Sequence, residues 1–420
     1  MQNFNDFISR LQKLIAFKSV KGVKEEGAPF GKEVANALNY FLQQAKEMGF
    51  ETKNYDNYIG EITYGSGDEI GIIGHVDVVP AGSGWDTDPY VLTYKDGEYY
   101  GRGILDDKAP LLCCLYALKE LKEQNIECNK KFRLFVGCNE ETGWKDVEYL
   151  EKSTKIPEYG FSPDGNFPVS YAEKGISIIT VKTPPLKLHS SVQGGTVINA
   201  VCGYASATPN YKVDESLLKK YELTYNGKEI ESVGKSCHGS KPELGINAIE
   251  KLYRYFLEVG EDVSLIVDTL FDDKMGISLL QNEQGRVTLS PNLIQNGVVI
   301  KCDCRIPAPL SQKDVERILN KTALNYTIQE KHPTQYVDKN GSFVQSMLTA
   351  YNEQTGENAL PISPSGSTFA RVFKKGVAFG PEFPNKPTSI HEPNERVSKE
   401  DLIKAYEIYK NAIFKLAKSE

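Results

Sequence analysis

Histidines and carboxylates occur in several short clusters along this chain, and most of the clusters directly follow an apolar segment. The clusters are His75-Val76-Asp77, Asp106-Asp107-Lys108, Asn139-Glu140-Glu141-Thr142, Asp164 and His391. Imidazole nitrogens together with several carboxylate oxygens form a hard, mixed donor set, which suits Zn²⁺, Mn²⁺ or Co²⁺ better than a thiolate site would. The clusters therefore predict metal-assisted hydrolysis.

A hydrolytic site with two metal ions needs a particular set of carboxylates. One carboxylate bridges the ions, which lie roughly 3.5 to 4 Å apart, others act as terminal ligands, and a free one takes a proton from water. The adjacent Glu140 and Glu141 can divide these tasks, because one can coordinate while its neighbour faces the water. Asp77 lies two residues after His75, so it can accept the second imidazole N–H and fix the tautomer.

Each cluster taken alone also has a simpler interpretation. His75 can be a hydrogen-bonded loop histidine, Asp106-Asp107 can begin a helix, and Glu140-Glu141-Thr142 can be a solvated turn. The three clusters occur together, however, and all three are interpreted as falling directly after strands of one sheet. This conjunction favours the metal site.

The elements that must position these residues can be read from the hydrophobic pattern. Apolar segments at 70–74 and 131–138 predict strands, and leucines on one face of 107–123 predict a helix between them. A strand, helix and strand in this order form a βαβ unit. Open α/β sheets bind ligands at the carboxyl ends of their strands, which is where the clusters lie.

The remaining pattern predicts two domains, as a length of 420 residues also suggests. Further helices are expected at 7–15, at 34–42, at 343–351 and from Ser398 onward. After Asp164 the pattern predicts strands at 176–181, 196–201, 221–225 and 298–305 and a helix at 246–257. We therefore expect an α/β domain with a mixed sheet flanked by helices, formed by 1–175 and 337–420, and an inserted α+β domain at 176–336.

The bulk composition limits the classes of partner that the protein is expected to bind. A net charge of -7 gives no basic surface for nucleic acid or an anionic membrane, so small molecules are the expected partners. No apolar run approaches the roughly 20 residues that span a bilayer, and the amino terminus lacks a secretion signal, so we expect a cytoplasmic protein. Eight cysteines without a C-x-x-C pair are expected to be reduced thiols. His189 and His332 belong to no cluster and are expected at the surface.

The clusters and their neighbours resemble the M20 metallopeptidases, and most of all the PepV-type dipeptidase branch. The segments that carry the resemblance are 74–80, 101–108, 139–143, 162–168, 234–240 and 390–395. They extend over nearly the whole chain. Two positions differ from the usual pattern of the branch: Cys237 stands where alanine is common, and Asn139 stands where an acidic residue is more usual.

The resemblance implies two divalent metal ions, with Zn²⁺ preferred and Mn²⁺ or Co²⁺ as alternatives. It implies these roles in the first domain: His75 and Asp164 on one ion, Glu141 and His391 on the other, Asp106 bridging both, Asp77 orienting His75, and Glu140 as the general base. It also implies a cis peptide bond between Asp106 and Asp107.

The resemblance further implies that the inserted domain is a lid over the substrate. His238 would stabilise the oxyanion, Asn199 and Arg305 would hold the free carboxylate of the substrate, and Gly366 and Ser367 would belong to a glycine-rich substrate loop. Arg305 can alternatively be a structural ion-pair residue at the end of a strand. In this branch the enlarged lid takes the place of a dimer partner, so a monomer is expected.

These assignments predict a dinuclear metal-dependent dipeptidase. It would hydrolyse unblocked dipeptides with a metal-activated water and Glu140 as the base. Aspartate rather than glutamate at position 164 fits the aminopeptidase or dipeptidase side of the family better than the carboxypeptidase side. The alternative within the family is an N-acyl amino acid deacylase or desuccinylase, which would use the same metal ions. A catalytically silent binding protein is a third possibility, and the presence of Glu140 with all five ligands argues against it.

Overall fold

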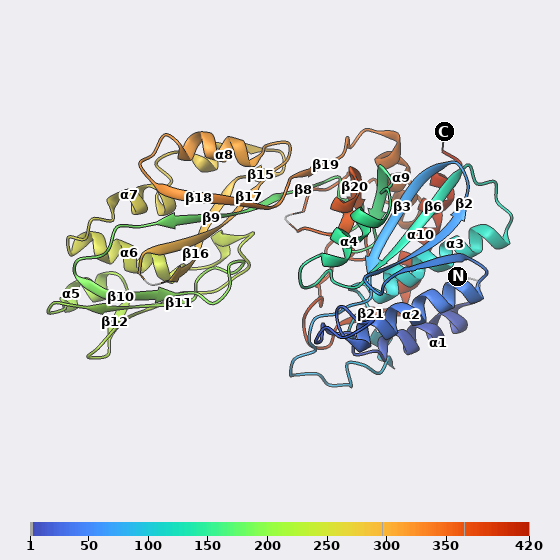
Figure 1. Cartoon of the computed structure of the whole chain (residues 1–420), viewed down its shortest axis with the longest axis horizontal. Coiled ribbons are helices and arrows are strands. Elements are labelled where there is room, and N and C mark those ends of the chain that lie inside the picture. The colour runs from blue at the N-terminus through green and yellow to red at the C-terminus, as the bar shows by residue number, and fades with distance from the viewer. Residues whose placement is uncertain (1–2, 296, 365, 420) are drawn as a thin grey trace. The chain divides into compact units, whose positions relative to one another are not determined.

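The structure is a computed structural model that describes residues 3–295, 297–364 and 366–419. The chain divides into two compact units. Unit 1 combines the chain up to Ala172 with the chain from Tyr336 onward, and unit 2 is the intervening segment Glu173–Gln335, drawn in green to orange in Figure 1. The sequence pattern placed these two boundaries after residues 175 and 336.

Unit 1 is built around a six-stranded mixed sheet. Its strands, in spatial order, are β1 (Glu51–Tyr55), β2 (Ile59–Gly65), β6 (Lys130–Gly137), β3 (Asp68–His75), β7 (Tyr159–Ser162) and β20 (Lys375–Ala378). Strands β6, β3, β7 and β20 are parallel, whereas β2 is antiparallel to both of its neighbours. A separate three-stranded sheet contains β4 (Thr93–Lys95), β5 (Glu98–Tyr100) and β21 (Arg396–Ser398). Strands β3 and β6 confirm the two strands predicted beside the first clusters.

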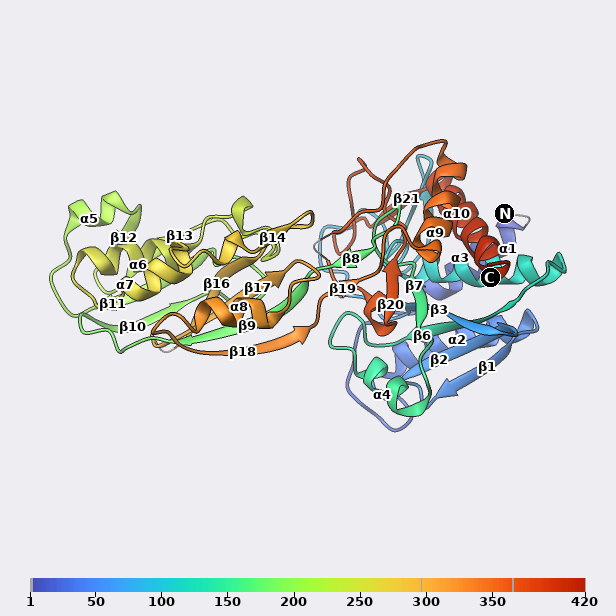
Figure 2. The ribbon, with the colours of Figure 1, turned by 90° about the horizontal axis from the view of Figure 1, so that it is seen from above.

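Helices flank this sheet, which confirms the predicted fold class. They are α1 (Phe4–Ile15), α2 (Lys32–Glu47), α3 (Lys108–Glu123), α4 (Lys145–Ser153), α9 (Ser342–Thr355) and α10 (Lys399–Ala417). Helix α3 connects β3 to the parallel strand β6 and so completes the predicted βαβ unit. Figure 2 shows α3 and α4 on opposite sides of the strands.

Glycines in the strands let these layers approach closely. A Cβ atom added to Gly74 would lie 3.0 Å from Leu111 of α3. On the opposite face, a Cβ atom at Gly71 would lie 2.1 Å from the ring of Phe373. Phe373 is fully buried there and packs with the 3-10 turn η4 (Phe369–Val372) and with α4. The sheet therefore has a packed layer on each face, and its strand ends are left for other contacts.

Unit 2 is an α+β structure, as predicted, with an eight-stranded antiparallel sheet. Its strands, in spatial order, are β12 (Leu223–Tyr225), β13 (Ile230–Val233), β11 (Tyr204–Pro209), β10 (His189–Gly194), β16 (Thr288–Gln295), β17 (Val299–Ile306), β9 (Gly175–Lys182) and β18 (Asn325–His332). Its helices are α5 (Glu215–Lys220), α6 (Ala248–Glu258), α7 (Ser264–Ile266) and α8 (Gln312–Leu319). Cys302 and Cys304 lie in its hydrophobic core.

Two expectations about unit 2 were wrong. Residues 196–201 form a turn and not a strand. Gly195 precedes this turn with a φ of +74°, and a Cβ atom there would lie 1.9 Å from the main-chain oxygen of Asn292, so the chain leaves β10 in a conformation that glycine favours. His189 is not at the surface, because its side chain is fully buried and its Nδ1 lies 2.8 Å from Glu261. His332 is half-buried at the end of β18.

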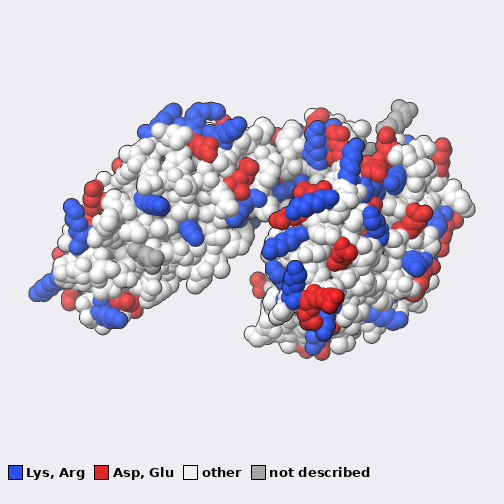
Figure 3. All heavy atoms as spheres, viewed as in Figure 1, with Lys and Arg blue, Asp and Glu red and all other residues white. Residues whose placement is uncertain are grey.

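The remaining general expectations concern the surface and the cysteines. All eight cysteines are free thiols. On the face drawn in Figure 3, acidic and basic side chains are interspersed. Within the described ranges, no helix is both long enough and apolar enough to cross a bilayer.

Candidate active site

The clusters converge at one edge of the unit 1 sheet. His75 is the last residue of β3, and Glu140 and Glu141 follow the end of β6. Asp164 lies two residues after β7. Because these strands are parallel, their carboxyl ends meet at the same edge. Asp106 precedes α3, whose amino terminus lies at this edge too.

Asp106 stands at the centre of the group, between two histidines. Its Oδ1 lies 2.8 Å from Nε2 of His75, and its Oδ2 lies 2.9 Å from Nε2 of His391. Oδ2 of Asp164 lies 3.7 Å from Nε2 of His75, and Oε1 of Glu141 lies 3.1 Å from Nε2 of His391. The structure thus brings together all five predicted ligands in two subsets that share Asp106. The peptide bond between Asp106 and Asp107 is cis, as predicted.

Two buried atoms of this group have no hydrogen-bond partner among the described residues. They are Nε2 of His75 and Oδ1 of Asp106, which face each other without the geometry of a hydrogen bond. Buried polar atoms are nearly always satisfied, so a pair left unsatisfied at one point indicates a missing ligand. Three possible ligand atoms lie within 4.8 Å of one another, one each from His75, Asp106 and Glu141. Mixed nitrogen and oxygen donors at this spacing fit a divalent transition-metal ion.

The electrostatics of the group also call for bound cations. Burial raises the pKa of the Glu140 carboxyl well above its usual range. Burial alone would lower the pKa of His75, but its contacts with nearby carboxylates, Asp106 first, raise it well above the usual value. Hydrogen bonds with Asp106 and Glu141 raise the pKa of His391 to about 11. The carboxylates therefore hold protons on the histidines, and divalent ions would take the place of those protons.

Asp77 has a different contact from the one predicted. Nδ1 of His75 lies 2.9 Å from the main-chain oxygen of Asp77, whereas the nearer carboxylate oxygen of Asp77 is 3.4 Å away. The carboxylate instead accepts hydrogen bonds from the backbone N–H groups of Glu140 and Glu141, at 3.2 and 3.3 Å. Asp77 is almost fully buried. Its carboxylate therefore holds the backbone of the two glutamates through these hydrogen bonds, and its main-chain oxygen orients His75.

Asp146 is a second residue that holds this loop, and no sequence pattern distinguishes it from other surface or core carboxylates. Its buried carboxylate accepts hydrogen bonds from the backbone N–H groups of Cys138 and Asn139 at 2.7 and 2.8 Å. The segment between β6 and α4 is therefore anchored directly before the two glutamates. Glu140 itself forms no side-chain hydrogen bond with any residue of the described chain, so its carboxylate is available.

Phe369 contacts His75, and the sequence did not reveal this contact. Its ring lies edge-on to the imidazole of His75, with 6.1 Å between the centroids, and edge-on to Trp144 at 5.1 Å. Gly366 and Ser367 lie just before this turn. The hydroxyl oxygen of Ser367 is buried and has no hydrogen-bond partner in the described part of the chain. The predicted substrate loop thus leads into a residue that contacts a predicted metal ligand.

The predicted residues of unit 2 form a cluster of their own. The backbone N–H of Gly239, next to His238, donates to the main-chain oxygen of Asn199 at 2.7 Å. A Cβ atom at Gly239 would lie 2.7 Å from Oδ2 of Asp303. Asp303 in turn accepts two hydrogen bonds from Arg305, from Nε at 2.7 Å and from Nη2 at 2.9 Å. Burial and the charge of Arg305 lower the pKa of His238.

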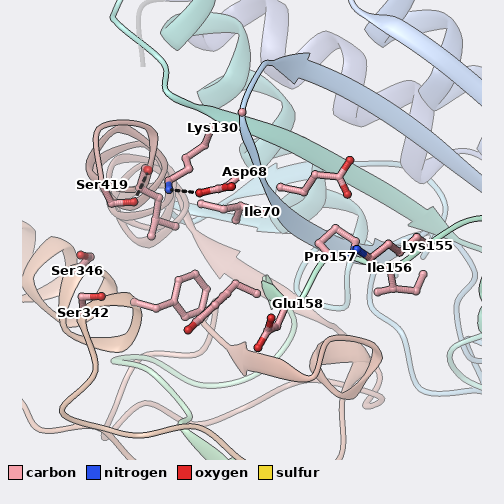
Figure 4. Close-up of a pocket in the computed structure, with 15 residues that line it drawn as sticks. Asp68, Ile70, Lys130, Lys155, Ile156, Pro157, Glu158, Ser342, Ser346 and Ser419 are labelled. Atoms are coloured by element: carbon pink, nitrogen blue, oxygen red, sulfur yellow. Dashed lines mark hydrogen bonds and ion pairs between the residues drawn. The ribbon is translucent and has the colours of Figure 1, made fainter.

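A separate cavity of about 570 Å³ lies at the other end of the unit 1 sheet, beside the start of β3 (Figure 4). Several of its charged groups form ion pairs: Lys130 lies 3.3 Å from Asp68, and Glu158 lies 3.1 Å from Lys375. A ligand there would have to compete with these ion pairs. The cavity lining contains none of the predicted ligands.

Comparison with known proteins identifies relatives over the whole chain. The sequence profile of peptidase family M20/M25/M40 matches residues 71–415. The Bacillus subtilis protein named "Putative dipeptidase YtjP" is 32% identical and aligns over 98% of this chain and 97% of its own length. A Staphylococcus saprophyticus protein with the same type of name, SSP1012, is 31% identical over 100% of this chain and 99% of its own.

Solved structures show the same fold at lower identity. The dipeptidase Dug1p of Saccharomyces cerevisiae matches with a TM-score of 0.61 and 15% identity, covering 100% of this chain and 97% of its own. Human carnosine dipeptidase 1 matches with a TM-score of 0.59 and 14% identity, covering 100% and 98%. The YXEP protein of Bacillus subtilis, described as a dinuclear metal-binding peptidase of the M20 family, matches with a TM-score of 0.52 and 10% identity, covering 98% of each chain.

The geometry around Asp106 predicts that metal ions stabilise the fold. Adding Zn²⁺ or Co²⁺ to chelator-treated protein should raise the unfolding free energy by about 2.7 kcal/mol when free ion is about 100 times Kd, because the ions bind only the folded chain. Asp106→Ala should lose most of this gain, as measured by thermal unfolding with and without metal.

The matched control for Asp106→Ala is Asp68→Ala, at the opposite end of β3. This variant should keep the metal-dependent gain of the unmodified protein. An equal gain in Asp106→Ala would show that the ions bind somewhere else.

Proposed function

The chain belongs to peptidase family M20/M25/M40 and is therefore a peptide-bond hydrolase, and from this premise we propose that it is a dinuclear metallodipeptidase acting on unblocked dipeptides. The observation that carries the proposal is the position of Asp106, which reaches His75 with one oxygen and His391 with the other. A carboxylate placed in this way can bridge two ions. The dipeptidase names of the relatives, which align over nearly the entire chain, support the choice of substrate.

The distances between these side chains support two ligand subsets. His75 and Asp164 would hold one ion, Glu141 and His391 the other, and Asp106 both. When bound, divalent ions polarise a substrate carbonyl and lower the pKa of water. Zn²⁺ is the ion we propose, with Mn²⁺ or Co²⁺ as alternatives that the same nitrogen and oxygen donors accept.

Glu140 is the proposed general base. Its backbone N–H is fixed by Asp77, and its carboxylate is free of side-chain hydrogen bonds in the described chain. It would accept a proton from the attacking water and then deliver this proton to the amine that leaves. The raised pKa of Glu140 suits a group that must take up a proton and release it again within one turnover.

Unit 2 is proposed to act as the lid that completes substrate binding. His238 would stabilise the oxyanion, and its lowered pKa keeps the imidazole neutral near pH 7, so that it would donate a hydrogen bond as a neutral group. Asn199 and Arg305 would bind the free carboxylate of the dipeptide. Arg305 donates to Asp303 through Nε and Nη2, so Nη1 is the atom that would contact the substrate.

The substrate loop and the cellular setting complete the proposal. Gly366 and Ser367 would contact the substrate from unit 1. The hydroxyl of Ser367 has no hydrogen-bond partner among the described residues, so it is the group that can bind the substrate. We place the enzyme in the cytoplasm because its eight cysteines are free thiols. We propose a monomer because the inserted unit 2 matches the enlarged lid of the resembling branch.

A substrate panel tests the proposed activity. Metal-reconstituted protein should hydrolyse unblocked dipeptides faster than tripeptides, and much faster than N-acetyl or N-succinyl amino acids. The measurement is kcat/KM for each compound under one set of conditions. A preference for the N-acyl amino acids would favour the deacylase or desuccinylase alternative, and full activity of protein shown to be free of transition metal would refute the metal-dependent mechanism.

Substitution of the proposed base gives a second test. Glu140→Gln should bind both ions and keep the fold but lose roughly 10²- to 10⁴-fold in kcat, because an amide cannot accept the proton of the water. Glu148→Gln, on the exposed surface of α4, is the control and should keep normal kcat. A near-normal rate for Glu140→Gln with its metal content verified would place the base elsewhere.

The role of Arg305 is tested with a dipeptide and its C-terminal amide. The unmodified enzyme should prefer the free acid by at least about 10-fold in kcat/KM, because the amide would leave Nη1 of the buried guanidinium without the carboxylate that it would bind. Arg305→Ala should reduce this preference to about 2-fold or less. Arg317→Ala, on α8 of the same unit, should retain it. Equal rates for acid and amide on the unmodified enzyme would leave Arg305 with the structural role alone.

A further inference from the structure

Glu395 is a fully buried carboxylate with an unusual number of donors around it. Its Oε2 accepts hydrogen bonds from Nη1 of Arg102 at 2.8 Å and from the backbone N–H of Gly103 at 3.0 Å. Its Oε1 accepts from the backbone N–H groups of Leu105 at 2.8 Å and Asp106 at 3.3 Å. One side chain therefore holds the whole turn that ends at the bridging aspartate.

The main chain of the same residue holds the start of this turn. The backbone N–H of Gly101 donates to the main-chain oxygen of Glu395 at 3.0 Å. The partner cation, Arg102, is 1% exposed and lies over the ring of Trp85, 5.3 Å from its centre. A charge buried this deeply must be paired, so Arg102 commits Glu395 to one position.

Glu395 also belongs to the loop that carries His391. Both His391 and Asn394 have left-handed backbone conformations, with φ of +63° and +61°. The side chain of Asn394 accepts a hydrogen bond from the backbone N–H of Asp86 at 2.8 Å, which fixes the loop from a second side. His391 itself is 49% exposed at its side chain, so packing alone does not hold its imidazole in place.

These contacts join two loops that come from distant parts of the sequence and that each present a proposed metal ligand. Oδ2 of Asp106 and Nε2 of His391 lie 2.9 Å apart across the junction. His75 and Asp164, by contrast, are placed by the ends of β3 and β7, which pair with each other along the sheet. Only the ion held by Asp106, Glu141 and His391 depends on the junction of the two loops for two of its ligands.

We propose that Glu395 is a positioning residue that sets the separation of Asp106 and His391, and so determines the affinity of the ion held by Asp106, Glu141 and His391. This inference rests on the proposed dinuclear site. Glu395 does not touch the substrate or the ions; it acts through the backbone of Asp106 and through the loop of His391. Residues that orient metal ligands in this way typically change metal affinity about 10- to 100-fold when they are substituted.

The test is a titration of chelator-treated protein with Co²⁺, followed by calorimetry and by the visible absorption of the bound ion. The unmodified protein should bind two ions. Glu395→Gln should weaken the binding of one ion by about 10- to 100-fold and that of the other by no more than about 3-fold. Glu392→Gln is the matched control, because Glu392 lies in the same loop with an exposed side chain, and it should bind both ions normally.

The outcomes separate this inference from the proposed function. If the unmodified protein binds fewer than two ions, the dinuclear site itself is refuted and this inference falls with it. If it binds two, then unchanged affinities in Glu395→Gln, or an equal loss at both positions, overturn the role of Glu395 alone. A purely structural residue would lower the melting temperature without this unequal effect on the two ions.

A second variant covers the case in which Glu395→Gln does not fold. Glu395→Asp keeps the negative charge beside Arg102, but its shorter side chain cannot reach all four donors. It should show the same unequal loss of affinity to a smaller degree. Normal binding of both ions by Glu395→Asp would likewise overturn the proposal.

Discussion

Mutual repulsion between carboxylates is the constraint on which the rest of this structure depends. Asp106, Glu141 and Asp164 approach one another at the edge of a sheet, where burial denies them the water that would screen their charges. Such a group is stable only with cations in its midst. Other buried carboxylates, such as those of Asp77 and Glu395, accept hydrogen bonds from backbone N–H groups next to the site. These hydrogen bonds hold the clustered carboxylates in place. The parallel strands, the turn before α3 and the loop of His391 can all be understood as supports for that arrangement.

Much of the site could be predicted because its residues follow regular elements. His75 and Glu140 come after strands whose apolar character is plain in the sequence, and parallel pairing then brings them to one edge. His391 follows no strand, so its residue type made it a candidate ligand but no sheet pattern placed it beside the others; the family resemblance did. Asp146 and Glu395 act through contacts with backbone N–H groups, and no periodic pattern reveals which backbone groups a distant carboxylate will meet.

The errors in unit 2 have equally specific causes. Residues 196–201 contain enough β-branched side chains to suggest a strand, but Gly195 turns the chain away before they can extend β10, so the tertiary context overrides the local preference. His189 lies in a polar stretch and was expected to be exposed. It is buried because Glu261 lies against Nδ1, at 2.8 Å, and because the hydroxyl of Tyr211 lies 3.3 Å from Nε2. The sequence places these two partners far from the histidine, so its polar surroundings were misleading.

Unit 1 is formed by two chain segments that are separated by unit 2, and this affects the order in which its parts can fold during synthesis. During synthesis the chain emerges amino terminus first, so β3, β6 and β7 with their ligands leave the ribosome well before β20, α9 and α10. Unit 2 is continuous in sequence and can fold while the first sheet still lacks its last strand. The nascent chain carries four of the five proposed ligands over this period, but it has neither His391 nor Glu395. In the proposed dinuclear site, the ion held by Asp106, Glu141 and His391 would therefore be captured late, which would keep an unfinished polypeptide from acquiring hydrolytic activity.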